Sequence, residues 1–353
     1  MKPVIFGLSG LELTDGESSF FRDAEPAGYI LFGRNIENRD QLRALTDQLK
    51  SLHGNDRLPI LIDQEGGRVA RMKPPEWPAF PAGGAFDALY DIAPMTAIEA
   101  ARVNAKAIGV TLAEVGITVN CLPLLDVRVP ETHAAIGDRA LGSEAKQVAA
   151  LGRAELLGMA QAGVVGIVKH IPGHGRANVD SHYDLPRVTA SADDLEQDIA
   201  PFRLLASAPM AMTGHILFDA WDSENCATMS QKIITEIIRG EIGFDGLLMS
   251  DDLDMKALSG DVSDRAAQCV AAGCDIALNC WGRMDEMERI ASALPQISAK
   301  AVARLHAAMD AIDPADVIEP LDALLAKRDA LLAQAGDHSE TKLTRAATGA
   351  SHG

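Results

Sequence analysis

The chain has 353 residues, of which 47 % are hydrophobic, and its formal net charge is −18. This length and apolar content can bury a large core, either as two ordinary domains or as one α/β barrel with additions. The acidic balance, without any block of Lys or Arg, argues against a nucleic-acid partner, and the absence of a run of about eighteen apolar residues argues against a membrane span.

The amino-terminal stretch MKPVIFGLSGLELT has one lysine and a short apolar run, and it lacks a long apolar core followed by a cleavage site. It therefore predicts a first strand and not a signal peptide. The five cysteines mostly lie in apolar runs, as buried free thiols of a cytoplasmic protein do. Cys269, Cys274 and Cys280 are close in sequence, but they contain no CxxC pair, so a metal cluster is disfavoured.

Short apolar runs that end in polar residues or glycine alternate with longer Ala- and Leu-rich stretches. The first pattern is typical of buried parallel strands and the second of helices. Strands are predicted at 4–10, 28–34, 59–66, 117–127, 166–173, 209–216, 246–252 and 274–280. Helices are predicted at 38–52, 95–115, 144–162, 194–206, 230–240, 262–272, 284–293 and 298–312. Eight such units favour an α/β fold with a single (β/α)8 barrel, with an open doubly wound sheet as the alternative.

Three further segments complete the predicted organisation. Residues 66–94 are rich in Pro, Gly and aromatic residues and predict a long loop that walls one side of a pocket. Leucines at helical spacing in 320–335 predict a helix packed outside the barrel. The polar segment 336–353 is expected to be a mobile tail, so the catalytic barrel would span 1–335 with no second folded domain.

The predicted strands end in polar residues, at the edge where barrels of this kind carry their function. Exposure of strand ends explains some of these residues, but it does not explain Lys169 and His170, which interrupt an apolar strand. Their number favours a site at this edge. The polar ends are Arg34 with Asn35, Asp63 with Glu65, Asp126, Lys169 with His170, His215, Asp251 with Asp252, and Asn279.

The fifth strand continues into KHIPGHGRANVDSH, residues 169–182. His170 and His174 have the spacing of two zinc ligands on one helix face, but the P-G-H-G sequence between and after them indicates a turning loop. Asp180 and His182 are two apart, so an extended loop would let the carboxylate hold the imidazole as a proton-transfer pair. An ordinary loop histidine beside an acid is the alternative.

The seventh strand ends in SDD, residues 250–252. Adjacent side chains on a strand face opposite ways, so only one of the two carboxylates is expected to enter the barrel mouth. That carboxylate is a candidate nucleophile or metal ligand. The other is expected to cap the next helix or to pair with a cation.

Several motifs in order resemble family 3 of the glycoside hydrolases, in particular its bacterial cytoplasmic β-N-acetylglucosaminidases of cell-wall recycling. The motifs are LIDQEGGRVARM, ITVNCLPLLDV, GDRALGS, KHIPGHG followed by DSH, and MSDDLDM. The resemblance extends from about residue 4 to about residue 330. It implies a single barrel of the short subgroup, in which a histidine on the loop after the fifth strand, paired with an aspartate, replaces an acid/base from a second domain.

By this resemblance, Asp251 is the nucleophile, His182 the general acid/base and Asp180 its partner. The resemblance also implies that a terminal amino sugar is held by Asp63, Arg71, Arg139, Lys169 and His170. Two positions depart from the family pattern, since Ile171 stands where many relatives have Phe and Asp254 where many have Ser. Both are expected to be peripheral, although Asp254 would alter the electrostatics near Asp251.

Retaining hydrolysis of muropeptide fragments by double displacement, without metal or cofactor, is therefore the expected function, and the protein is expected to be a cytoplasmic monomer. A histidine suits the acid/base role because its ordinary pKa of about 6.5 lies near the working pH. One alternative is a metal-dependent barrel hydrolase that uses His170, His174, His215 and Asp251. Another is a sugar-binding protein without turnover.

Overall fold

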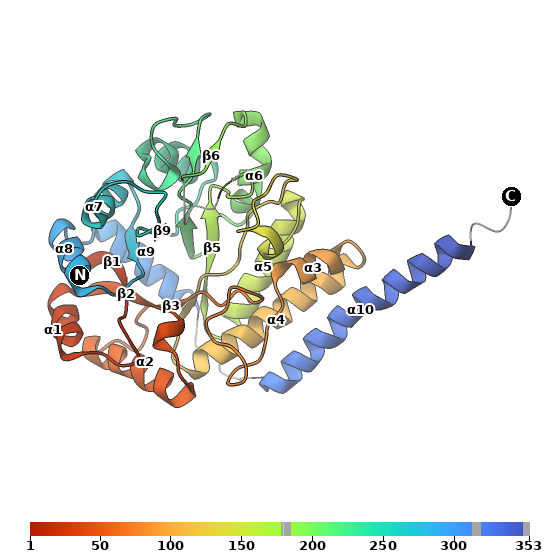
Figure 1. The fold of residues 1–353 in the computed structure, drawn as a ribbon, viewed down its shortest axis with the longest axis horizontal. Coiled ribbons are helices and arrows are strands. Elements are labelled where there is room, and N and C mark those ends of the chain that lie inside the picture. Colours follow the sequence, from red (N-terminus) through yellow and green to blue (C-terminus); the bar gives the residue numbers. More distant parts are fainter. Residues whose placement is uncertain (178, 180–184, 313–318, 349–353) are drawn as a thin grey trace.

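A computed structural model describes residues 1–177, 179, 185–312 and 319–348, with side chains described as far as residue 335. Eight parallel strands close into a barrel in the spatial order β1-β10-β9-β7-β5-β4-β3-β2 (Figure 1). The predicted (β/α)8 barrel is confirmed, and the doubly wound alternative is wrong. The barrel strands are β1 (Lys2–Gly7), β2 (Pro26–Leu31), β3 (Ile60–Ile62), β4 (Val119–Asn120), β5 (Val165–Ile171), β7 (Met210–Thr213), β9 (Leu247–Asp252) and β10 (Ile276–Asn279).

Helices surround the barrel strands at the predicted places. They are α2 (Arg39–His53), α4 (Pro94–Glu114), α5 (Ala145–Ala160), α6 (Ala192–Leu204), the π-helix η4 (Ile233–Glu241), α7 (Val262–Ala272), α8 (Met284–Ala293) and α9 (Ala299–Asp310). Short 3-10 turns lie at Gly33–Asn35, Gly137–Arg139 and Ala227–Met229.

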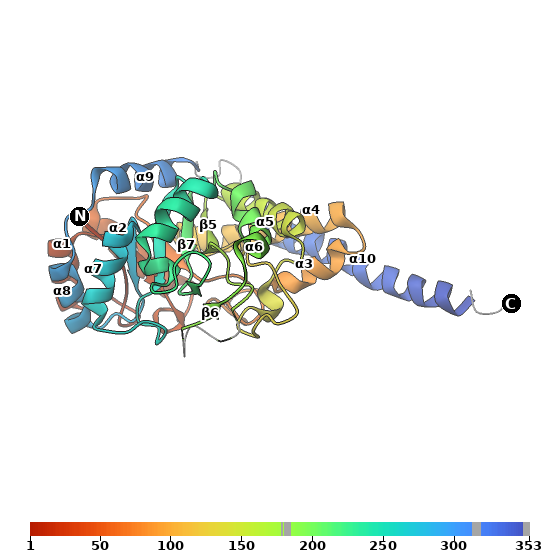
Figure 2. The same cartoon turned by 90° about the horizontal axis from the view of Figure 1, so that it is seen from above.

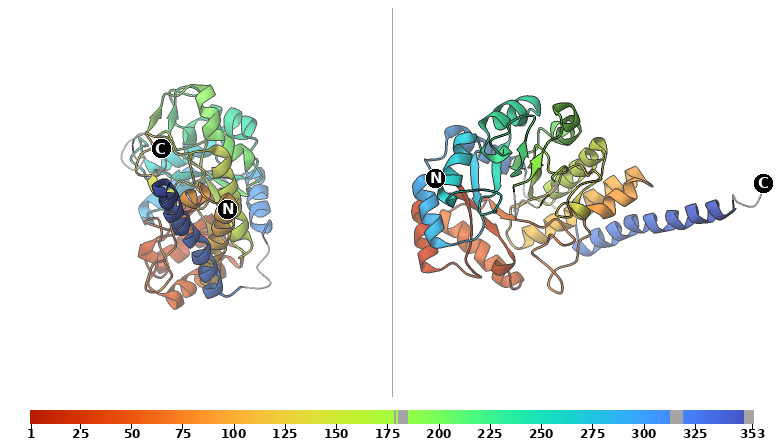
Figure 3. Two further views of the ribbon diagram at one scale, coloured as in Figure 1. Left: turned by 90° about the vertical axis from the view of Figure 1, so that its right-hand side faces the viewer. Right: turned by 45° about the horizontal axis from the view of Figure 1, so that its top comes forward.

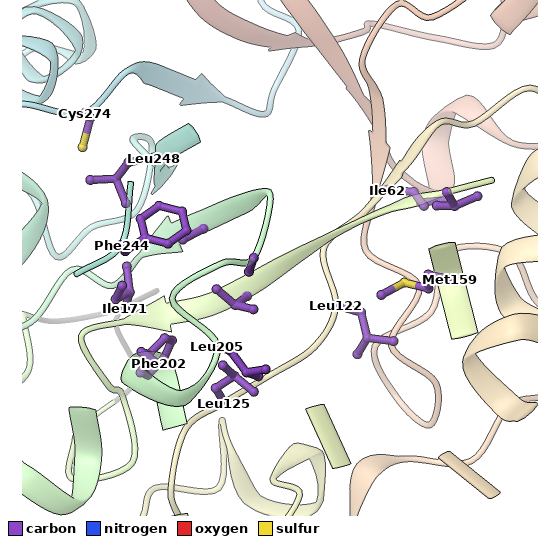
Figure 4. Close-up of a cluster of buried hydrophobic side chains, with 14 of the residues drawn as sticks. Ile62, Leu122, Leu125, Met159, Ile171, Phe202, Leu205, Phe244, Leu248 and Cys274 are labelled. Carbon is purple, nitrogen blue, oxygen red and sulfur yellow. The ribbon is translucent and has the colours of Figure 1, made fainter. Parts of the chain in front are cut away.

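Apolar side chains form two layers, one inside the barrel and one between strands and helices. The alternation of side chains along each strand produces this division, because successive residues point to opposite faces. On β5, Ile167 packs inside the barrel, whereas Ile171 belongs to the outer layer, where Phe202 and Phe244 also lie (Figure 4). The departure from the family pattern at Ile171 therefore lies in the core outside the barrel and does not face the site.

Helix α9 closes the amino-terminal end of the barrel. Leu305, Ala308 and Met309 of this helix belong to the same buried cluster as the side chains inside the barrel. Figure 2 shows α9 across one end of the barrel, with β6 at the opposite end. The open end of the barrel is therefore the carboxyl end of the strands.

Some elements were not predicted. Helix α1 (Asp15–Ala24) follows the first strand, and α3 (Gly83–Tyr90) lies within the segment 66–94 that was expected to be a loop throughout. Strands β6 (Arg187–Val188) and β8 (Leu217–Phe218) pair in a separate two-stranded sheet. Both of these strands follow barrel strands, so the small sheet lies in the loops beyond the carboxyl end.

Helix α10 (Leu321–Thr348) packs against α3 and α4 and then extends away from the barrel (Figures 1 and 3). Leu324 is buried, and Lys327 pairs with Glu99 of α4 at 2.7 Å. The expected tail is therefore helical as far as Thr348, while its mobility and the boundary at residue 335 stay predictions. No helix of the described residues is long and apolar enough to cross a membrane, and all five cysteines are buried and free.

Candidate active site

A cavity of about 280 Å³ lies at the carboxyl end of the strands. Six of the predicted site residues line it together, although they come from five different parts of the chain: Asp63, Arg71, Arg139, Lys169, His170 and Asp251. The other two, Asp180 and His182, lie outside the described residues. The closed barrel explains the convergence, since the carboxyl ends of all its strands meet at one mouth.

Lys169 is the centre of a buried network of charges. Its Nζ lies 2.6 Å from Oε1 of Glu65 and 3.1 Å from Oδ1 of Asp63, and the residue is only 2 % exposed. Arg139 binds both oxygens of Glu65 at 2.8 Å, and Arg71 donates to Asp63 at 3.1 Å. Each buried charge thus has an opposite partner, as burial in a medium of low dielectric constant requires.

These pairs keep both carboxyl groups ionised. Burial alone would raise the pKa of Asp63 and of Glu65, but Lys169 with Arg71 or Arg139 outweighs burial and holds both values below their usual range. Burial would likewise lower the pKa of Lys169, and the two carboxylates raise it instead. The network therefore presents fixed donors and acceptors to the cavity, which suits recognition of a polyhydroxylated ligand.

Asp251 lies at the end of β9 and is almost fully buried. Its Oδ1 accepts the backbone N–H of Asp252 at 2.8 Å, and its Oδ2 lies 4.0 Å from Nε2 of His170. Burial raises the pKa of this carboxyl, but His170, His215 and the backbone N–H together lower it below the usual value. Asp251 is therefore an ionised carboxylate at the cavity wall, as a nucleophile must be.

Asp252 also lines the cavity, so the prediction that only one carboxylate would enter the barrel mouth is wrong. Strand alternation fails here because Asp252 is the last residue of β9. Its Oδ1 accepts the backbone N–H groups of Asp254 and Cys280, and within the described part of the chain it caps no helix and forms no ion pair. Burial, with further contributions from Asp254 and Asp251, raises its pKa to about 7.

Asp126 holds the histidines of the fifth strand, a role that the sequence did not assign to it. Its Oδ2 lies 2.8 Å from Nδ1 of His170, and its Oδ1 accepts the backbone N–H groups of His170 and His174. With Nδ1 held by Asp126, the other ring nitrogen of His170, Nε2, faces Asp251, 4.0 Å from its Oδ2. Asp126 and Glu65 are thus two buried acids that hold predicted site residues, and their signal in the sequence was their position at strand ends.

The described residues do not assemble the alternative metal site. His215 uses both ring nitrogens, Nδ1 toward Oγ1 of Thr228 at 2.8 Å and Nε2 toward the carbonyl oxygen of Asp252 at 2.9 Å. His174 is buried, and burial with His170 nearby lowers its pKa to about 4. In the part of the chain that the structure describes, no three His, Cys, Asp or Glu side chains are arranged to hold a metal ion.

Glu155 of α5 lies directly behind the charge network. It shares a small cavity of about 10 Å³ with Glu65 and Arg139, and its Oε2 has no hydrogen-bond partner among the described residues. Burial, together with the nearby charge of Glu65, raises its pKa to about 8. Glu155 is therefore a neutral carboxylic acid over most of the physiological range.

Replacing Glu155 by Gln is expected to stabilise the protein at alkaline pH. Between pH 4.5 and 8 the folded state keeps a proton that the unfolded state releases, so the stability of the wild type falls as the pH rises through this interval. Gln has no such proton. Urea unfolding should give similar free energies for both proteins at pH 4.5 and an advantage of roughly 2–5 kcal/mol for Glu155→Gln at pH 9.

Glu224→Gln is the matched control, because Glu224 is exposed. Its unfolding free energy should follow the wild type at every pH. Parallel curves for the wild type and Glu155→Gln would contradict a neutral Glu155.

The fold and the pocket define a (β/α)8-barrel enzyme with a buried anionic carboxylate beside a polar cavity. The model of the glycosyl hydrolase family 3 N-terminal domain matches residues 10–313. A beta-hexosaminidase of Bordetella avium is 36 % identical over 283 residues, which are 79 % of this chain and 80 % of the relative. One of Alkalilimnicola ehrlichii is 38 % identical over 285 residues, with the same shares of 79 % and 80 %.

Among solved structures, NagZ from Neisseria gonorrhoeae in complex with N-trifluoroacetyl-D-glucosamine is 31 % identical, with a TM-score of 0.81. The similarity covers 95 % of this chain and 97 % of that one. The chain belongs to glycosyl hydrolase family 3. It is a glycoside hydrolase, and the resemblance inferred from its motifs is confirmed.

Proposed function

We propose that the chain is a retaining exo-β-N-acetylglucosaminidase. The observation that carries the proposal is the ionised, buried carboxylate of Asp251 beside a cavity lined by hydrogen-bonding charged groups. The names of the relatives support the amino sugar, because they are beta-hexosaminidases and a NagZ bound to an N-acylated glucosamine. Asp63, Arg71, Arg139, Lys169 and His170 would bind the hydroxyl and N-acetyl groups of the terminal sugar.

The reaction has two steps, of which the first forms a covalent intermediate and the second hydrolyses it. Asp251 attacks the anomeric carbon while the glycosidic bond breaks, and His182, oriented by Asp180, gives a proton to the leaving oxygen. His182 then takes a proton from water, and the water oxygen attacks the same carbon and releases Asp251. Two inversions give net retention of the β configuration.

The substrate proposed within this class is N-acetylglucosamine linked to 1,6-anhydro-N-acetylmuramic acid, with or without its peptide. Cleavage of such fragments would place the enzyme in peptidoglycan recycling in the cytoplasm, where it serves cell-wall biogenesis, cell shape and division. We propose a monomer that needs no metal or cofactor. The support for these finer points is the resemblance of the motifs.

Replacing His182 by Ala tests the mechanism with an aryl N-acetyl-β-glucosaminide. A good aryl leaving group needs little acid help, whereas the second step still needs the base, so a covalent sugar adduct on Asp251 should accumulate. Mass spectrometry after rapid quench should show the added mass of one N-acetylglucosaminyl group on a peptide that contains Asp251.

The wild type serves as the control, with little adduct and full activity in EDTA. Loss of activity on chelation would support the metal-dependent alternative. Absence of the adduct at early times would indicate a direct, inverting displacement. Absence of any turnover of this substrate by the wild type would support the alternative of a sugar-binding protein.

A further inference from the structure

Trp281 is an exposed aromatic residue next in the chain to a residue that lines the active-site cavity. It is the second residue after β10, and the residue between them, Cys280, lines the cavity. The side chain of Trp281 is 51 % exposed, and no other aromatic side chain of the described residues is exposed to this degree. A large ring left in water close to a cavity marks a surface that a ligand can cover.

The ring of Trp281 is held in place on one side. The guanidinium of Arg283 lies over it, 5.2 Å from the ring centroid, and Arg283 is itself fixed by a 2.8 Å pair with Glu286. Gly282 has a φ of +67°, and a Cβ there would lie 2.5 Å from the carbonyl carbon of Leu8. The turn is therefore packed tightly against the end of β1, and the indole is preorganised.

Arg283 also links this turn to the loop after the nucleophile. Its charge interacts with the carboxylate of Asp254, three residues after Asp251. Asp254 accepts a hydrogen bond from Asn279, the last residue of β10, at 2.8 Å. The two loops that follow β9 and β10 are thus joined by contacts, and the position of Trp281 is tied to that of the site.

The size of the cavity indicates which part of a disaccharide would lie outside it. At about 280 Å³ it is below the usual range of about 300–1,000 Å³ for pockets of drug-sized ligands, so it has room for a single sugar ring. The second sugar of a disaccharide must then lie outside the cavity, at its mouth. The flat apolar face of an indole matches the C–H face of a sugar ring.

We propose that Trp281 is the platform for the leaving-group sugar of a disaccharide substrate, with Arg283 supporting the indole from the opposite face. The inference rests on the proposed N-acetylglucosaminidase function and adds a second subsite to it. Trp281 contacts no reacting atom in this arrangement. Its contact is made both before and during bond cleavage, so it contributes to binding of the longer substrate.

The test compares two substrates that share the terminal sugar. N,N′-diacetylchitobiose carries a second sugar ring, whereas N-acetyl-β-glucosaminyl fluoride has a leaving group without any ring. Trp281→Ala should lower kcat/KM for the disaccharide about tenfold, mainly through KM, and leave kcat/KM for the fluoride within about twofold.

Three further variants make the result specific. Trp281→Phe keeps an aromatic face and should recover most of the disaccharide activity, and Arg283→Ala should give an intermediate loss. Leu204→Ala, an exposed apolar residue of α6, should match the wild type on both substrates.

Equal losses on both substrates, or no loss on the disaccharide, would overturn the platform while the proposed function stands. Failure of the wild type to cleave either substrate would overturn the proposed function, and the platform with it.

Discussion

Asp251→Ala is expected to lower hydrolysis of an aryl N-acetyl-β-glucosaminide by at least about 10³-fold, because it removes the carboxylate that we propose forms the covalent bond to the anomeric carbon. Asp252 is next to Asp251, but its Oδ1 accepts the backbone N–H groups of Asp254 and Cys280, and its pKa of about 7 leaves it about half protonated at neutral pH. Release of the aryl group, followed at saturating substrate, measures the loss.

Asp252→Asn is the matched control for this variant. Asn has the shape of a protonated Asp and keeps the oxygen that accepts from Asp254 and Cys280, so its activity near pH 7 should stay within about tenfold of the wild type. Azide should restore turnover to Asp251→Ala by taking the space of the missing carboxylate, with an α-glycosyl azide as product. A β-configured product, or a larger loss in Asp252→Asn than in Asp251→Ala, would contradict the assignment.

The barrel could be predicted from the sequence because its strands are short, continuous apolar runs buried on both faces. Lys169 and His170 stood out because they interrupt such a run, and the structure places both at the cavity. Helix α1 was missed although Thr14 and Glu17 form a capping box, a local signal that is readable in the sequence. Helix α3 was missed because its neighbours are rich in Pro and Gly.

The partners within the site could not be predicted in the same way. Glu65 and Arg139 are 74 residues apart, and Asp126 and His170 are 44 residues apart, so only closure of the barrel brings them together. The alternation of side chains along a strand predicted that the two carboxylates of SDD point to opposite faces. That alternation does not hold for Asp252, because β9 ends at this residue. Long-range pairing and the last residue of a strand are both set by tertiary structure.

Lys169→Met should destabilise the protein by about 3–5 kcal/mol at pH 7, besides removing a donor from the proposed sugar site. Met has a similar length and fits the apolar part of the space. The loss of stability therefore measures the effect of removing the ammonium charge. Without Lys169, the carboxylates of Asp63 and Glu65 stay buried with Arg71 and Arg139 as their remaining cationic partners. Urea unfolding at pH 7 measures the difference.

The pH dependence of this loss separates charge from packing. Lys169 helps to hold the pKa of Asp63 and of Glu65 below their ordinary values, so its contribution is present above about pH 4 and is lost as the pH falls and the carboxylates take up protons. The gap between wild type and Lys169→Met should therefore narrow below pH 4, whereas a packing defect would persist. Lys327→Met is the control, because it removes only an exposed ion pair with Glu99. It should lower the free energy of unfolding by less than about 1 kcal/mol both at pH 7 and below pH 4. An equal cost for the two lysine variants would show that the buried network does not depend on Lys169.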